Sequence, residues 1–232
     1  MDLGTSLPED ALMAKTTAKI LLEIGAAYFN VEKPFIFTSG WASPVYIDCR
    51  KLISFPRARR TIIEFSVAKI LRGAGFESLD AVVGGETAGI PFAAWIADRL
   101  QLPMLYVRKQ PKGFGRLAQI EGDLHEGLRL ILVEDLTTDA KSKVNFCKAL
   151  RTAGGHVKHA FVVFHYGIFP QSLETMKEIG VNLHALATWW DVIEVAEEEG
   201  YFAPHTLKEV RRFMGDPVTW SREHGGLAEF SS

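Results

Sequence analysis

The sequence predicts an α/β fold built on a mainly parallel sheet flanked by helices, and three observations lead to this prediction. Segments of strand character alternate with segments of helical spacing between residues 81 and 164, an order typical of parallel strands joined by right-handed crossovers. The segment LILV at residues 130–133 has no polar alternation, which indicates a strand covered on both faces. No internal repeat, low-complexity tract or proline-rich linker divides the chain, so we expect one domain over residues 1–232 with an N-terminal helix and a C-terminal helical extension.

The part of the chain before residue 80 is expected to supply a helix, a short hairpin and a second helix. Ser6 and Glu9 have the spacing of a capping box, and apolar residues keep helical spacing from there to Gly25. The other elements expected here are strands at 35–37 and 45–47 around the Ser39-Gly40 turn, and a helix over 57–71 that ends at Gly73.

The alternating segments that follow are expected to form the sheet and its crossovers. The expected strands are 81–83, 104–107, 130–133, 157–164 and 183–188, and the expected helices are 90–100, 143–153, 173–179 and two that start at Asp191 and Thr206. The acidic run at 197–199 is most simply a solvated helix face.

Composition excludes several classes of protein. With 232 residues and 47% apolar content the chain can bury a full core, and its net charge of −2 gives no general attraction to nucleic acid or to an anionic membrane. The two cysteines, Cys49 and Cys147, match no zinc-binding or redox spacing, which suits a reducing compartment. No signal peptide pattern or membrane-length apolar segment is present, so we expect a soluble cytoplasmic protein.

The run LILVEDLTTDAKSK at residues 130–143 suggests a site for a phosphorylated sugar. Glu134 and Asp135 follow the apolar strand and are expected at its carboxyl end, where α/β proteins bind ligands. Two carboxylates can hold a ribose diol, and backbone N–H groups at the start of the next helix favour a phosphate. The alternative is that both carboxylates cap that helix and lie in solvent. The turn consists of Thr137, Thr138, Asp139, Ala140, Lys141 and Ser142.

A second loop, GGETAG at residues 84–89, also lies between an expected buried strand and a helix. Its glycines can expose backbone N–H groups to an anion, although Gly-Gly turns are also common in ordinary connections. The chain has neither the Walker pattern nor a GxGxxG fingerprint. A pentose phosphate therefore fits this pair of loops better than a dinucleotide does.

The stretch between residues 107 and 129 carries four cations among several glycines, which fits a mobile lid. The alternative is a solvated basic loop. Nucleic-acid binding is not supported, because the stretch lacks interleaved aromatic residues and the chain has no helix-turn-helix pattern. The four cations are Arg108, Lys109, Lys112 and Arg116.

Four segments, in order, resemble those of type I phosphoribosyltransferases, and more narrowly those of the orotate phosphoribosyltransferase family. They are FTSGWASPVYID, VVGGETAGIP, VRKQPKGFGRLAQIEG and LILVEDLTTDAKS, and the resemblance runs from about residue 35 to 166. It implies the type I phosphoribosyltransferase fold, a mobile lid shared between the subunits of a homodimer, and Mg²⁺-dependent transfer of a phosphoribosyl group from phosphoribosyl diphosphate (PRPP) to orotate. Two other functions stay open: a non-catalytic PRPP-sensing regulator on the same fold, and a phosphoribosyltransferase for another base.

The resemblance also implies roles for individual residues. Lys112 matches the lid's catalytic lysine, and Asp135 would act in catalysis and contact the metal through water. The implied PRPP-binding residues are Glu86, Thr87, Ala88, Gly89, Arg108, Lys109, Lys112, Glu134, Asp135, Thr137, Thr138, Asp139, Ala140, Lys141 and Ser142. The implied orotate-binding residues are Thr38, Ser39, Gly40, Tyr46, Thr138 and Tyr166. Tyr46 is a candidate for stacking on the pyrimidine, whereas a strand tyrosine is more often part of the core.

Several positions depart from the family's usual residues. Ala140 and Lys141 stand where glycines are common, and a Cβ in a turn that needs positive φ costs roughly 1–2 kcal/mol. Lys141 can offset this cost by contacting the phosphate directly. The other departures are Ala88 and Thr38 in place of lysine, Phe114 in place of histidine, and His165 and Tyr166 near the position of an arginine.

Overall fold

The computed structural model describes residues 8–37, 39–113, 115, 118–169 and 171–227. Within these residues the main sheet has six strands in the order β10-β9-β8-β5-β6-β7, and every neighbouring pair is parallel except β6 and β7. The strands are β5 (Ala81–Gly85), β6 (Met104–Val107), β7 (Ile120–Glu121), β8 (Arg129–Thr137), β9 (His156–His165) and β10 (Asn182–Thr188). The predicted α/β class with a mainly parallel sheet is confirmed.

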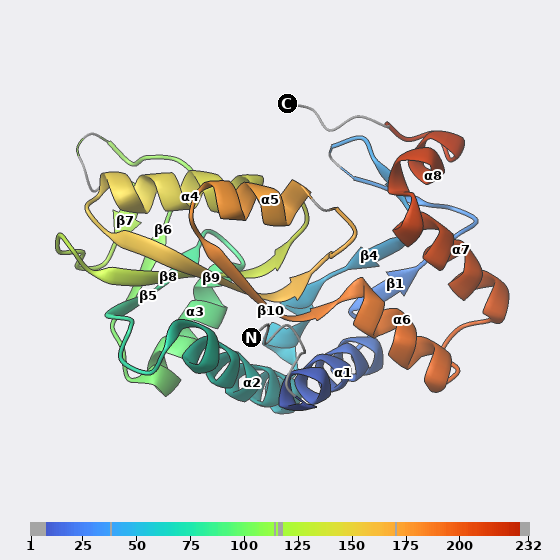
Figure 1. Ribbon diagram of the computed structural model, residues 1–232, viewed down its shortest axis with the longest axis horizontal. Coiled ribbons are helices and arrows are strands. Elements are labelled where there is room, and N and C mark those ends of the chain that lie inside the picture. Colours follow the sequence, from blue (N-terminus) through green and yellow to red (C-terminus); the bar gives the residue numbers. More distant parts are fainter. Residues whose placement is uncertain (1–7, 38, 114, 116–117, 170, 228–232) are drawn as a thin grey trace, which may run out of the picture.

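Helices cover both faces of this sheet, with α4 and α5 on one side and α1, α2 and α3 on the other (Figure 1). Successive residues of β5 and β8 point to different cores: Val82 and Val133 to one, Val83 and Leu132 to the other. This two-sided burial explains why the central strands are apolar without alternation. The helices are α1 (Pro8–Glu23), α2 (Pro56–Ala74), α3 (Gly89–Leu100), α4 (Lys141–Thr152) and α5 (Gln171–Glu178).

Two small antiparallel pairs and three C-terminal helices extend the structure beyond one end of the sheet (Figure 1). Helix α8 packs on β3, where the Ser221 hydroxyl accepts a hydrogen bond from Ala42 N–H at 3.0 Å and Leu227 N–H donates to the Gly40 carbonyl at 2.8 Å. The C-terminal extension thus fixes the Ser39-Gly40 turn. These elements are β1 (Ala27–Phe29), β2 (Phe35–Ile36), β3 (Ala42–Ser43), β4 (Val45–Ile47), the 3₁₀ helix η1 (Cys49–Ser54), α6 (Trp189–Glu198), α7 (Pro204–Gly215) and α8 (Pro217–Glu223).

The structure corrects the predicted end of the second helix. Helix α2 continues through Gly73 to Ala74, and the chain turns at Gly75, which has φ +100°. Gly73 is required for packing instead, because a Cβ there would lie 2.3 Å from the His184 ring. Strands β1, β3 and β7 and helices η1 and α8 were not predicted, and the proposed Ser6 cap lies outside the described residues.

None of the helices in the described part of the chain has both the length and the apolar character needed to cross a bilayer. The single-domain organisation over residues 1–232 stays a prediction.

Candidate functional site

The two consecutive carboxylates, Glu134 and Asp135, lie within β8 and are both buried, with 8% and 9% of their surface exposed. Strand β8 continues to Thr137 between β5 and β9, so the acidic pair is held by the centre of the sheet and not by a loose connection. The alternative in which both carboxylates lie in solvent is therefore wrong. A pair of buried carboxylates needs compensating charge or hydrogen bonds nearby.

Lys143, in the first turn of α4, supplies that compensation. Its Nζ lies 2.6 Å from Glu134 Oε2, and it also donates to the Leu136 carbonyl at 2.6 Å and contacts the Ser142 hydroxyl at 3.2 Å. Ser142 Oγ donates to the same Glu134 oxygen at 3.2 Å. Sequence analysis missed Lys143. The sequence does contain one indication of its role. Lys143 lies on the same helix face as the apolar residues Phe146, Cys147 and Leu150, where a cation is unusual.

Asp135 has a different environment from its neighbour. Burial raises the pKa of Asp135, the positive charge of Lys143 opposes that rise, and the negative charge of Glu134 adds to it. With two carboxylates and one ammonium group, the cluster retains a net negative charge when all three are ionised. Such a cluster favours a cation or the hydroxyl groups of a sugar as its partner.

In the turn after β8, one residue, Ala140, has a left-handed backbone conformation, which residues other than glycine rarely adopt. Ala140 has φ +65° and ψ 3° and is buried, and the Asp139 carboxylate accepts a hydrogen bond from Lys141 N–H at 3.1 Å. Lys141 begins α4 and is not at positive φ, so the expected strain applies to Ala140 alone. The Thr137 hydroxyl is buried with no hydrogen-bond partner among the described residues, a state that a ligand oxygen would relieve.

The second loop, at residues 84–89, packs directly against the carboxylates. A Cβ at Gly85 would lie 2.7 Å from Glu134 Cγ, and a Cβ at Gly89 would lie 2.3 Å from the Val133 carbonyl oxygen. The glycines are therefore needed for the close approach of this loop and α3 to β8. The peptide bond between Glu86 and Thr87 is cis, and Ala88 immediately precedes α3.

The basic stretch begins where β6 ends and returns as β7. Glu86 joins it to the glycine loop, since its carboxylate accepts a hydrogen bond from Lys109 N–H at 2.7 Å. Arg108 contacts Glu121 at 3.4 Å, and Lys112 N–H donates to the Ala118 carbonyl at 2.7 Å while the Lys112 side chain is exposed. This part of the stretch is thus an antiparallel extension of the sheet. Phe114 and Arg116 lie outside the described residues, and the mobile lid stays a prediction.

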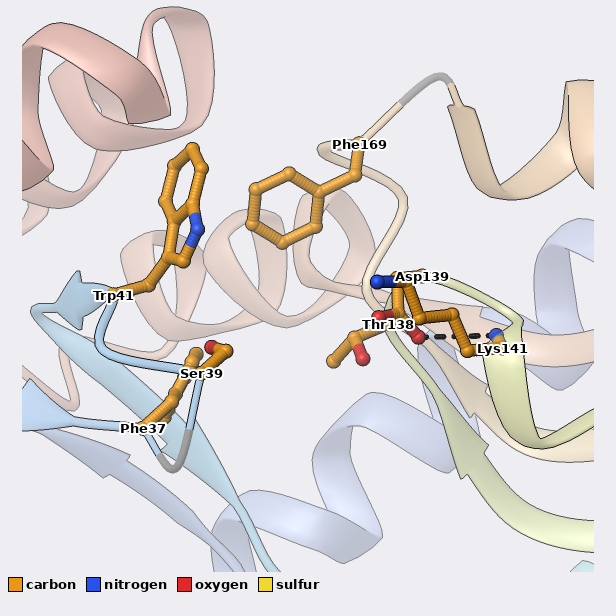
Figure 2. Close-up of a pocket in the computed structure, with 7 residues that line it drawn as sticks. All are labelled: Phe37, Ser39, Trp41, Thr138, Asp139, Lys141 and Phe169. Atoms are coloured by element: carbon orange, nitrogen blue, oxygen red, sulfur yellow. Dashed lines mark hydrogen bonds between the residues drawn. The ribbon is translucent and has the colours of Figure 1, made fainter. Parts of the chain in front are cut away.

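A pocket lies between the turn that follows β8 and the turn between β2 and β3 (Figure 2). Trp41 and Phe169 line it and pack edge to face, with ring centroids 5.6 Å apart at 79°, and sequence analysis missed both. Ser39 and Thr138, predicted for the orotate side, both line it, and Gly40 lies beside Ser39. Its lining residues are Phe37, Ser39, Trp41, Thr138, Asp139, Lys141 and Phe169.

The two tyrosines predicted for the orotate side lie in aromatic packing and not in the pocket lining. Tyr46 is half-buried, with its ring 5.7 Å from that of Phe35, and its hydroxyl accepts a hydrogen bond from Arg50 at 3.3 Å. Tyr166 is buried edge-on against Trp189, and burial raises its pKa. Thr38 lies outside the described residues. The roles of all these residues toward orotate stay predictions.

Comparisons with known proteins agree on one family, although no family model matches the chain. An orotate phosphoribosyltransferase from Dinoroseobacter shibae is 54% identical over 96% of this chain and 98% of its own length, and one from Rhizobium johnstonii is 53% identical over 99% of both. The crystal structure of orotate phosphoribosyltransferase from Aeropyrum pernix has a TM-score of 0.67 and 32% identity, covering 80% of this chain and 99% of that one. The Leishmania donovani UMP synthase has a TM-score of 0.74 and 25% identity, covering 87% of this chain and 42% of that one. The buried carboxylate pair, the two loops that meet at it and these relatives together assign the chain to the orotate phosphoribosyltransferase family.

Proposed function

We propose that this protein transfers the phosphoribosyl group of PRPP to orotate, giving orotidine monophosphate and pyrophosphate, a step of pyrimidine synthesis. One observation carries the proposal: the buried pair Glu134 and Asp135 stands where the glycine loop and the left-handed turn at Ala140 meet. This arrangement offers carboxylates to a ribose and backbone N–H groups to the phosphates at either end of it. Family membership makes orotate the acceptor.

Breaking the bond at an anomeric carbon passes through an oxocarbenium-like state. The residues therefore need to stabilise charge on the departing diphosphate more than they need to supply a nucleophile. Arg108, Lys109 and Lys112 provide cations for that task, with Lys112 donated to a neighbouring subunit's site in a homodimer. Glu134 and Asp135 bind the ribose hydroxyls, and the turn from Thr137 to Ser142 binds the sugar phosphate.

Mg²⁺ fits the residues present at this site. No group of three or more histidine, cysteine, aspartate or glutamate side chains converges within the described residues, and Mg²⁺ commonly uses one or two carboxylates together with water and substrate phosphates. Lys143 pairs with Glu134, which leaves Asp135 as the carboxylate to contact the ion, through water. When bound with PRPP, the ion neutralises charge on the diphosphate.

The pocket that Trp41 and Phe169 line together with Phe37 is the proposed site of the pyrimidine ring. Aromatic side chains suit a flat ring, and Ser39, Gly40 and Thr138 offer hydroxyl or backbone groups to its polar edge. Tyr46 and Tyr166 act from behind the pocket by supporting Phe37, which contacts both of their rings. We place the protein in the cytoplasm, because Cys49 and Cys147 are both buried free thiols.

The test is an absorbance assay with purified protein, Mg²⁺, PRPP and orotate. We expect orotate to be consumed in a PRPP-dependent reaction, and we expect uracil and purine bases, as controls, to remain. Consumption of one of these bases in place of orotate would support a phosphoribosyltransferase of other specificity. PRPP binding without conversion of any base would support the PRPP sensor, the reading that Ala140 and Lys141 in the phosphate turn favour.

A further inference from the structure

We propose that Lys143 is a positioning residue for this reaction: it holds the ionised Glu134 side chain, and the end of β8, in the arrangement that binds the ribose of PRPP. The inference rests on the proposed function, because it takes Glu134 and Asp135 as the ribose-binding pair. Lys143 is one of few buried polar side chains among the described residues, and it is 4% exposed.

Every hydrogen-bond donor of the Lys143 ammonium group has an acceptor. Three oxygens surround Nζ: Glu134 Oε2 at 2.6 Å, the Leu136 carbonyl at 2.6 Å and Ser142 Oγ at 3.2 Å. An ammonium group carries three N–H donors, so this geometry uses its full capacity. A flexible lysine side chain is thereby fixed in one position.

These contacts fix the two residues on either side of Asp135. Glu134 precedes it and Leu136 follows it, and both are bound to the same ammonium group. Glu134 is confined on its other side, because the space beside its Cγ exists only while position 85 is glycine. Lys143 therefore controls the orientation of the carboxylate pair without needing to touch the substrate.

Stability alone does not explain a lysine at this position. Lys143 shares the buried face of α4 with Phe146, Cys147 and Leu150, where an apolar residue would pack without losing hydration. Replacing a buried ion pair by well-packed apolar residues is often neutral or stabilising, whereas removing one partner leaves an uncompensated charge. The presence of the cation is better explained by what it does to the carboxylates.

The charged and titratable groups around Lys143 make the inference measurable. Glu134 and Asp135 face it from β8 and His165 from β9, where the lysine charge adds to burial in lowering the pKa of His165. Without the lysine charge, two adjacent buried carboxylates would repel each other and lose the contact that orients them. PRPP binding would then weaken.

The experiment compares Lys143→Met, Lys143→Arg and Lys148→Met, the last replacing an exposed lysine on the same helix. We expect Lys143→Met to weaken PRPP binding by roughly ten- to a hundredfold, the range for losing a charge-assisted hydrogen bond. Lys143→Arg should restore part of the binding, Lys148→Met should match the wild type, and KM for orotate should change less than KM for PRPP.

Calorimetric titration with PRPP distinguishes a failure of the proposed function from a failure of this inference. Wild-type protein that binds no PRPP would overturn the proposed function and this inference with it. Wild-type protein that binds PRPP, with Lys143→Met binding equally well, would overturn the inference alone. If Lys143→Met does not fold, the double variant Glu134→Gln with Lys143→Met removes both buried charges. That variant is compared with Glu134→Gln alone: equal PRPP affinity of the two supports the inference, because Lys143 then acts through Glu134, and a further loss in the double variant contradicts it.

Discussion

Gly89 lies directly against the carbonyl of Val133: a Cβ at position 89 would be 2.3 Å from that oxygen and 3.1 Å from Glu134 Cα. The first residue of α3 thus touches β8 at the step just before the carboxylate pair. This contact packs the glycine loop directly against the strand that carries the carboxylate pair, and any side chain at position 89 must push them apart.

We expect Gly89→Ala to lower the free energy of unfolding by about 1–3 kcal/mol, because the added methyl meets backbone that cannot rotate away. PRPP affinity should fall as well, since the loop and the carboxylates would separate. Urea denaturation and calorimetry measure the two effects. Gly215→Ala is the matched control, because a Cβ there meets nothing within 4 Å. Equal stability of Gly89→Ala and the wild type would refute the close contact.

Asp135→Asn should remove the carboxylate charge while keeping a side chain of nearly the same size. Burial raises the pKa of Asp135, so the folded state disfavours the charged form and the neutral amide should leave stability unchanged or slightly higher. PRPP affinity should fall by roughly one to two decades, as expected for a lost charge-assisted hydrogen bond of about 1.5–3 kcal/mol. Thermal unfolding and calorimetry test this, with the exposed Asp123→Asn as control. Unchanged PRPP binding would remove Asp135 from the site.

Lys112→Ala should reduce turnover far more than PRPP binding, because its charge matters most as the diphosphate departs. Single-turnover rates and calorimetric affinities measure the difference, and Lys158→Ala, at an exposed residue on β9, serves as control. An equal loss of binding and turnover would make Lys112 a simple PRPP ligand.

Mixed subunits address whether the predicted lid is shared. In a homodimer with crossing lids, combining Lys112→Ala subunits with Asp135→Asn subunits should restore part of the activity, because one site in each mixed dimer receives both wild-type groups. Activity measured across mixing ratios tests this expectation. No recovery at any ratio would leave a shared lid unsupported.

The strands were more predictable than the contacts that build the site. Residues 130–133 have a continuous apolar pattern because both faces of β8 are covered, and that pattern is visible in the sequence. The role of Gly73 was predicted wrongly. The sequence alone does not distinguish a glycine that ends a helix from one that leaves space for a side chain of another element, here the His184 ring. The short strand β7 has only two residues, too few to show any periodicity.

Within the candidate site too, residues on a predicted strand were found from the sequence, whereas residues that meet only by tertiary contact were not. Glu134 and Asp135 were located by their place at the end of an apolar strand. Lys143 was missed because its ion-pair partner, Glu134, belongs to another element, and Trp41 and Phe169 were missed because the chain brings them together from positions far apart. Such pairings depend on tertiary packing, which a single sequence does not display.

The pair His159 and His184 predicts a loss of stability in acid. Their ring nitrogens are 3.0 Å apart, and burial, then His159, then Lys69 lower the pKa of His184 to about 4. The unfolded state binds this proton near pH 6.5, so stability is complete above that pH and falls as pH drops toward 4, by up to about 3 kcal/mol. Urea denaturation at several pH values should show a smaller loss in His184→Gln, and His125→Gln, at an exposed site, should behave as the wild type. A His184→Gln curve parallel to the wild type would contradict this assignment.

The last prediction concerns Ala140 and Lys141, which stand where the family usually has glycines. The left-handed backbone conformation of Ala140 costs roughly 1–2 kcal/mol. Its Cβ lies in the turn proposed to present N–H groups to the sugar phosphate. We expect the double variant Ala140→Gly with Lys141→Gly to bind ribose 5-phosphate more tightly than the wild type does, because glycine relieves the strain and opens the turn. If Lys141 instead contacts the phosphate, the double variant loses a cation worth about 1.5–3 kcal/mol and binds more weakly, with a shallower salt dependence.

The single variants separate these two effects. Ala140→Gly alone should tighten binding under either account, whereas Lys141→Met weakens binding only if the ammonium group is a phosphate ligand. Calorimetric titrations of ribose 5-phosphate at two salt concentrations distinguish the cases, since a contact between opposite charges weakens as salt screens it. The strain lies in the left-handed backbone of Ala140, which glycine adopts without cost, and we therefore expect tighter binding by the double variant. Equal affinity in all four proteins would show that this turn does not bind the phosphate.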